Sequence, residues 1–336
     1  MSIPLSILDL APIAPGHTVR QSFAASVTLA QTAERFGYQR VLYAEHHNMA
    51  TIASSATSIL IGHIAEHTST IRLGAGGVML PNHSPLVIAE QFGTLATLFP
   101  DRIDLGLGRA PGSDQATFRA LRRAADSSED FPQDVVELQA FLRGESIVPG
   151  VQAVPGAGTD VPLYILGSSL FGAQLAASLG LPYAFASHFA PDALQQAVAI
   201  YRRDFQASRQ LATPHVLAGV NVIAASDSAD ARQQFETSRR NRVRGMLSRG
   251  STDQKLSDAD IDEFLTTASG RNIASMMRYT AVGDPAEVRT YLEEFATLAH
   301  ADELMVLHGA TDVDDRLRSV ELTAVAMDDA LSPAGR

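Results

Sequence analysis

Short apolar runs alternate along the chain with longer amphipathic stretches. The stretches repeat apolar residues at helical spacing, as Phe23, Val27 and Ala30 do. Eight apolar runs are predicted to be strands: Ile3–Leu8, Arg40–Ala44, Thr70–Leu80, Arg102–Leu107, Pro162–Leu166, Pro182–Ser187, Val216–Ala224 and Glu303–His308. Strands separated by helices predict a parallel sheet of the α/β class. Eight of them favour a closed (β/α)8 TIM barrel, and fewer real strands would favour a doubly wound sheet.

Several helix boundaries carry residues suited to them. Ser84 followed by Pro85 is typical of an N-cap and a first helical residue, and Pro100 ends that helix. The segment Asp284–Glu287 combines a capping Asp, a Pro at the first position and a Glu three residues on. The pattern therefore predicts helices from about 85 to 99 and from 285 onward.

The alternation weakens in two places, Gly112–Asp160 and Ser226–Tyr279. The first contains two Val-Pro-Gly turns, and the second is charged with several helical segments. We interpret them as insertions after the fourth and seventh strands of one domain that spans residues 1–336.

Composition narrows the class of protein. The 336 residues carry a net charge of −11, so bulk attraction to nucleic acid or anionic membranes is not expected. The absence of Cys excludes disulfides and thiol chemistry. No signal peptide and no apolar stretch of about 20 residues is recognisable. A cytoplasmic protein is the resulting expectation.

Polar and glycine-rich segments follow four of the predicted strands, where the active site of a barrel is built. They are Ala44–Asn48, Gly74–His83, Gly106–Gly112 and Gly167–Ser169. Gly167, Ser168 and Ser169 open a helix, whose free N–H groups would bind an anion, and Arg109 would add a cation. An ordinary helix cap beside a surface Arg is the alternative. Neither a dinucleotide fingerprint nor a P-loop is present.

Glycine and histidine residues supply two further signals. Gly76 and Gly77 weaken a strand unless something approaches the backbone closely, such as a flat ring, and a β-bulge is the alternative. His46 and His47 follow a buried strand, where either catalysis or a core hydrogen bond would suit them. His63–His67 matches a zinc-protease pattern, but no third ligand is identifiable, so no metal site is predicted.

Three motifs in fixed order resemble one known family: Tyr43–His47, Leu73–Pro81 and Arg102–Arg109. The chain resembles the luciferase-like, flavin-dependent monooxygenases from Ser6 to about Leu322, least so across Ser226–Tyr279. The likeness implies a (β/α)8 barrel that holds FMN at its C-terminal mouth. It also implies a homodimer through the helices at about Ala53–Glu66 and Pro85–Leu98.

The resemblance assigns roles to single residues. His46 matches the catalytic His beside the flavin, and Arg109 matches the phosphate-binding Arg. Gly167, Ser168 and Ser169 match the phosphate loop, and Gly76–Gly77 matches a non-prolyl cis peptide under the flavin ring. Luciferase itself has an acidic residue in place of Gly167 and a Cys in place of Gly108, which lies beside the same cofactor site.

The implied reaction uses reduced FMN and O2 to oxidise a small organic substrate, with His exchanging protons near neutral pH. Because no nicotinamide fingerprint is present, a separate flavin reductase is expected to supply the reduced cofactor. A hydride-transferring enzyme that uses a deazaflavin coenzyme and a non-catalytic flavin-binding protein are the two alternatives. The substrate cannot be read from the sequence.

Overall fold

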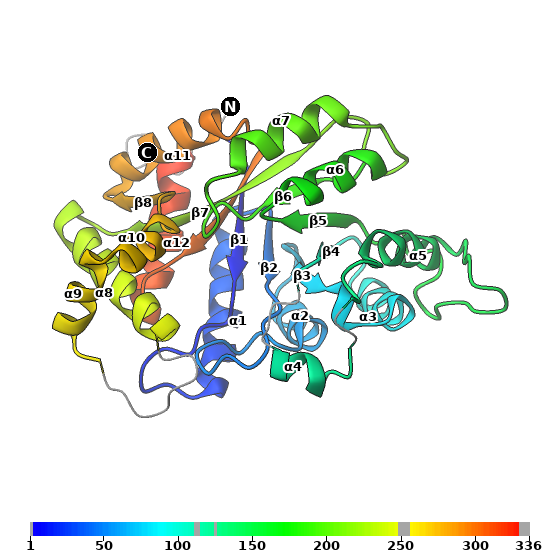
Figure 1. The fold of residues 1–336 in the computed structure, drawn as a ribbon, viewed down its shortest axis with the longest axis horizontal. Helices are drawn as coiled ribbons and strands as arrows, with labels where there is room; N and C mark the ends of the chain where they lie inside the picture. The colour runs from blue at the N-terminus through cyan, green and yellow to red at the C-terminus, as the bar shows by residue number, and fades with distance from the viewer. Residues whose placement is uncertain (1–2, 111–114, 124–125, 248–255, 329–336) are drawn as a thin grey trace.

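The fold is a closed barrel of eight parallel strands surrounded by helices (Figure 1). It is seen in a computed structural model that describes residues 3–110, 115–123, 126–247 and 256–328. The strands pair in the order β1-β2-β3-β4-β5-β6-β7-β9, and β9 pairs with β1 to close the ring. The barrel strands are β1 (Leu5–Asp9), β2 (Arg40–Tyr43), β3 (Arg72–Met79), β4 (Ile103–Gly108), β5 (Leu163–Gly167), β6 (Tyr183–Phe185), β7 (Val216–Ala224) and β9 (Glu303–His308). The predicted (β/α)8 barrel is confirmed.

A ninth strand, β8 (Thr280–Gly283), was missed by the sequence analysis. It pairs with Asn221–Ala224 at the end of β7, beyond the residues 216–218 that pair with β6. Because β7 is nine residues long, it has room for both partners. The four residues of β8 directly follow the stretch 226–279, and so short a run carries little periodic signal.

Helices surround the barrel and also fill the two stretches of weak alternation. Those that surround it are α1 (Val19–Arg35), α2 (Thr57–Glu66), α3 (Pro85–Leu98), α5 (Phe131–Arg143), α6 (Leu170–Leu179), α7 (Leu194–Asp204), α11 (Pro285–Leu298) and α12 (Val313–Met327). The additional ones are α4 (Gln115–Ala120), α8 (Ser228–Leu247), α9 (Asp258–Thr266) and α10 (Ala268–Ser275). In Figure 1, α5 lies at one end of the molecule and α8 to α10 lie at the other. No helix in the described part of the chain combines the length and apolar character needed to cross a membrane.

Two predicted helix starts agree with the structure. α3 begins at Pro85 with Ser84 as N-cap. α11 begins at Pro285, where the Asp284 side chain accepts from the N–H of Glu287, and the Glu287 side chain accepts from the N–H of Asp284. Both helices begin with Pro at the first position, and the capping hydrogen bonds are made by Asp284 and Glu287, whereas the Ser84 side chain makes none.

Successive strand residues face two different cores. One set packs outward against the helices, as Val41, Leu73 and Val306 do. The alternate set points into the barrel, where a small apolar cluster forms from Leu8, Leu42, Ala44 and Met305, with Leu10 and Leu307 packed against it. This cluster lines the carboxyl half of the barrel interior.

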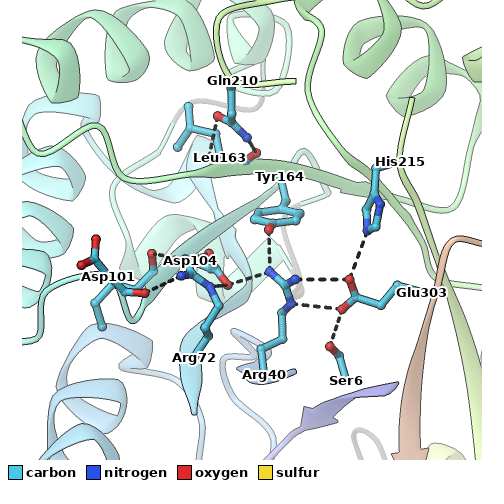
Figure 2. A network of polar contacts seen from close by, with 11 residues as sticks. Ser6, Arg40, Arg72, Asp101, Asp104, Leu163, Tyr164, Gln210, His215 and Glu303 are labelled. Carbon is cyan, nitrogen blue, oxygen red and sulfur yellow. Dashed lines mark hydrogen bonds and ion pairs between the residues drawn. The ribbon is translucent and has the colours of Figure 1, made fainter. Parts of the chain in front are cut away.

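The amino ends of the strands are closed by a network of charged side chains (Figure 2). Arg40 lies between two buried carboxylates: it donates to Glu303 Oε1 at 3.0 Å and Oε2 at 3.2 Å, and to Asp104 Oδ2 at 2.8 Å. Arg72 pairs with the other oxygen of Asp104. We call this set the amino-end network: Ser6, Arg40, Arg72, Asp104, Tyr164, His215 and Glu303. It fills the amino half of the barrel with paired charges.

Candidate active site

The segment after β2 carries a buried carboxylate between two imidazoles. Glu45 is 1 % exposed, and its Oε1 lies 2.8 Å from His47 Nε2 and 2.9 Å from His83 Nε2. Its Oε2 accepts a 3.1 Å hydrogen bond from the N–H of Met79. Since Glu45 follows β2 whereas Met79 and His83 lie at and after the end of β3, the carboxylate ties two neighbouring strand ends together.

These hydrogen bonds shift the pKa values of Glu45 and His47 in opposite directions. Burial alone would raise the pKa of Glu45, but hydrogen bonds from His47, His83 and Met79 outweigh it and lower the pKa to about 2. The hydrogen bond to Glu45 raises the pKa of His47 above its usual 6.5, against the opposing effect of burial. Glu45 and His47 therefore form a local ion pair, which gives His47 a structural role.

His46 turns away from this ion pair. Glu45 and His47 turn to one side, as residues two apart do in an extended segment, so His46 between them turns to the other. The charge of His46 contributes to lowering the pKa of His188, a buried residue that follows β6. The two imidazoles are therefore close enough to interact electrostatically.

The peptide bond between Gly76 and Gly77 is cis, as the resemblance predicts. A Cβ on Gly76 would lie 2.7 Å from Leu42 Cβ, and one on Gly77 would lie 2.7 Å from the Gly106 carbonyl oxygen. A Cβ on Gly108 would lie 2.9 Å from Met79 Sδ. Close approach to the neighbouring strands therefore already requires small residues at 76 and 77, whereas at 108 the flexible end of Met79 can move aside. A cofactor contact at these positions stays a prediction.

Arg109 and the start of α6 lie together. The Arg109 guanidinium carbon lies 4.2 Å above the ring of Phe171, in the first turn of α6. β5 ends at Gly167, and Ser169 is the N-cap of α6, with an extended backbone and a side chain that makes no capping hydrogen bond. An exposed cation is thus stacked beside a helix N-terminus that has free N–H groups.

The predicted site residues come from four strands that are neighbours in the barrel. His46 follows β2, Gly76 and Gly77 lie in β3, Gly108 and Arg109 end β4, and Gly167 ends β5. All are at the carboxyl ends, so one face of the barrel carries every candidate. The sequence analysis missed Glu45, which is the partner of both His47 and His83, and it gave no role to His188. Glu45 was within a quoted motif, whereas His188 stands alone after β6 and gives no pattern.

The His63–His67 segment lies at the end of α2, away from the strand ends. The two His rings are 4.6 Å apart, and His67 Nδ1 lies 2.8 Å from the backbone oxygen of His63. Among the described residues there is no group of three or more side chains placed to hold a metal ion.

The fold places the chain among the (β/α)8-barrel proteins, and comparison with known proteins identifies the family. The family model for luciferase-like monooxygenases matches residues 3–301. The chain belongs to the luciferase-like monooxygenase family. A luciferase-like monooxygenase of Escherichia coli (strain K12) is 50% identical over 323 residues, which cover 96% of each chain.

Solved structures agree with the fold. The apo form of MsnO8 has a TM-score of 0.86 and 37% identity, with 98% of this chain and 99% of that chain covered. The oxygenating constituent of 3,6-diketocamphane monooxygenase from Pseudomonas putida, solved with FMN, has a TM-score of 0.72 at 17% identity, with 96% and 98% covered. At that identity, the second likeness concerns the fold alone.

Proposed function

We propose that the protein is an FMN-dependent monooxygenase that uses reduced FMN and O2 to oxidise a small organic substrate. The observation that carries this proposal is the stacking of Arg109 on Phe171 at the N-terminus of α6. Free helix N–H groups and one planar guanidinium are suited to a terminal phosphate. Family membership supports the choice of a flavin.

The residues of the mouth fit FMN. Ser168, Ser169 and the first turn of α6 would hold its phosphate with Arg109, and the apolar cluster of Leu8, Leu42, Ala44 and Met305 lies inside the barrel below the strand ends. When bound, reduced FMN supplies the electrons that activate oxygen. The apolar lining of the chain would keep water from the reacting atoms.

In this proposal His46 is the proton-exchanging group. It would face the mouth, whereas His47 is hydrogen-bonded to Glu45. A neutral imidazole exchanges protons readily near pH 7, so His46 would take a proton from the substrate or deliver one at its ring nitrogen. Glu45 and His83 would keep the strand end that carries His46 in place.

A deazaflavin-dependent hydride-transferring enzyme is the second candidate, since a similar phosphate cradle would serve it. A non-catalytic flavin-binding protein would need no base at position 46. Absorption spectra of the purified protein after mixing with FMN and with the deazaflavin coenzyme distinguish the first two candidates.

The test of FMN binding uses two flavins that differ only in the phosphate. Calorimetry should show that FMN binds more tightly than riboflavin. Arg109→Ala should remove most of the difference, roughly 1.5–3 kcal/mol for a hydrogen bond to a charged group. Arg119→Ala, in α4, is the control and should change neither affinity. Equal affinities of the unmodified protein for the two flavins would contradict the proposal.

Partners and domain organisation complete the proposal. We expect a separate flavin reductase, so oxidation of NADH or NADPH by the purified chain alone would contradict this part.

We also propose a homodimer through α2 and α3, where Ile59, Val87 and Leu98 are exposed at 75 %, 43 % and 64 %. A single 35.8 kDa species in sedimentation would rule the dimer out. The stretches 112–160 and 226–279 are proposed as insertions within one domain spanning 1–336.

A further inference from the structure

His188 is buried inside the barrel, and its ring makes no hydrogen bond to a described residue. The residue is 7 % exposed, and a Cβ added to Gly219 would lie only 2.5 Å from its Nδ1. Neither ring nitrogen has a hydrogen-bond partner among the residues that the structure describes, and Nδ1 is fully buried. The backbone oxygen of His188 accepts a 2.7 Å hydrogen bond from Asn221, which fixes the loop. An unsatisfied buried imidazole costs free energy unless a ligand completes it.

The position of His188 is across the mouth from His46. His46 follows β2 and His188 follows β6, and these two strands lie on opposite sides of the eight-stranded ring. The two imidazoles nevertheless interact, since the charge of His46 contributes to lowering the pKa of His188. Both side chains therefore reach toward the barrel axis, where a bound substrate would lie.

Arg242 brings a positive charge to the same place. Burial, together with the charges of Arg242 and His46, lowers the pKa of His188 to about 3, so that imidazole is neutral. Arg242 is itself partly buried, and burial lowers its pKa. A cation removed from water is costly unless an anion accompanies it.

The other arginines of α8 are paired. Arg232 binds Glu287, Arg239 binds Glu236, Arg240 binds Asp262, and Arg244 binds Asp258. Arg242 alone among the five makes no ion pair with any described residue of the chain. An unmatched guanidinium on a helix of matched ones points to a partner beyond the described residues, and a bound anion would supply it.

The packing of α8 directs this helix at the mouth. Asn241 donates a 3.2 Å hydrogen bond to Thr311, in the loop that follows β9. A Cβ on Gly309 would lie 3.7 Å from the Ser238 hydroxyl. The middle of α8 thus lies against the carboxyl end of β9, next to the strand β7 that carries Gly219 and Asn221.

We propose that Arg242 and His188 form a subsite for the carboxylate of the substrate, so that the enzyme oxidises a small organic acid. The guanidinium would bind the two carboxylate oxygens, and a neutral His188 would donate one hydrogen bond. One positive charge suits a monoanion. This inference rests on the proposed function, because it assumes that the reaction takes place at the same mouth.

The phosphate of FMN is a second anion that Arg242 and His188 could bind, and it has to be distinguished from a substrate carboxylate. That phosphate has its own proposed cradle at Arg109 and the start of α6, after β4 and β5. Arg242→Gln should therefore leave the ratio of FMN to riboflavin affinity unchanged, whereas Arg109→Ala should reduce it. If Arg242→Gln reduces that ratio and Arg109→Ala does not, the subsite binds the cofactor and the proposal is wrong.

The direct test is binding of matched acids and amides to the FMN-saturated protein, measured by calorimetry. The probes are acetate, butyrate and 4-phenylbutyrate, each with its amide. At least one acid should bind roughly 10–100-fold more tightly than its amide, the range of a hydrogen bond to a charged group. Arg242→Gln should abolish this preference, Arg242→Lys should restore part of it, and His188→Gln should reduce it.

Arg240→Gln is the matched control, two residues away on the same helix and paired with Asp262, and it should keep the full preference. Thermal melts of each variant confirm that it is folded. No preference for any acid, or the same preference in Arg242→Gln, overturns the subsite.

The same titrations without flavin separate the two proposals. Acid preference in a protein that does not bind FMN supports the subsite and refutes the flavin function, whereas FMN binding without acid preference refutes only the subsite.

Discussion

The two ends of the barrel interior hold charged and polar groups in opposite ways. At the amino end, Arg40 and Arg72 are matched by Glu303 and Asp104, and the carboxylates are 2 % and 0 % exposed. At the carboxyl end, glycines and an apolar cluster line the interior, Glu45 is paired with His47 and His83, and His188 has no hydrogen-bond partner among the described residues.

This difference separates stability from function. Buried charges that satisfy one another leave nothing for a ligand to complete, so the amino end serves only the fold. The N-terminus of α6, Arg109 and the subsite of Arg242 and His188 lack counter-charges from the described chain. Groups in that condition are suited to binding.

The largest expected effect is at the carboxyl end. His46→Ala should lower substrate-dependent oxygen uptake by roughly 10²–10⁴-fold, the usual contribution of a general base, while FMN affinity stays unchanged. His47→Ala should instead lower the melting temperature, because it removes a partner of Glu45. A folded, FMN-binding His46→Ala protein with nearly normal turnover would remove His46 from the mechanism.

The next largest effect is a loss of folding stability when the amino-end network is broken. Glu303→Ala removes the partner of Arg40 and His215 and leaves a buried charge partly unpaired. Breaking such a pair typically costs about 3–5 kcal/mol, and urea unfolding measures it.

The exposed pair of Arg209 and Asp160 supplies the control. Arg209→Ala should cost at most about 1 kcal/mol, because solvent screens that pair. FMN affinity should be unaffected by Glu303→Ala in the folded protein. If Glu303→Ala and Arg209→Ala cost the same, the amino-end network does not stabilise the barrel.

The sequence pointed to candidate residues at the carboxyl end and to almost none of the amino-end network. Strand ends rich in Gly, His and Ser are visible as segments, so His46, Arg109 and Gly167 could be named. Arg40, Asp104 and Glu303 begin or nearly begin their strands, far apart in the chain, and only barrel closure brings them together. The subsite residues were missed for the same reason: His188 is one loop residue, and Arg242 is one of five arginines on a charged helix.

The smallest of the three effects appears as a pH dependence at Glu45. Its pKa falls from 4.5 to about 2 on folding, which corresponds to about 3 kcal/mol of stabilisation of the ionised form. Because the folded pKa is the lower one, this stability is present above about pH 4.5 and is lost as the pH falls toward 2. His47 behaves in the opposite way: its folded pKa is raised, so its contribution is complete below 6.5 and is lost as the pH rises through the folded pKa.

The two contributions overlap between about pH 4.5 and 6.5. The difference in unfolding free energy between the unmodified protein and Glu45→Gln should therefore be largest in that window and should decline on both sides. Urea unfolding of both proteins across this range measures it, and taking the difference cancels other carboxylates, such as Glu34, whose pKa is also lowered. A difference that is flat with pH would mean that Glu45 and His47 are not an ion pair. The segment that carries His46 would then be held by packing.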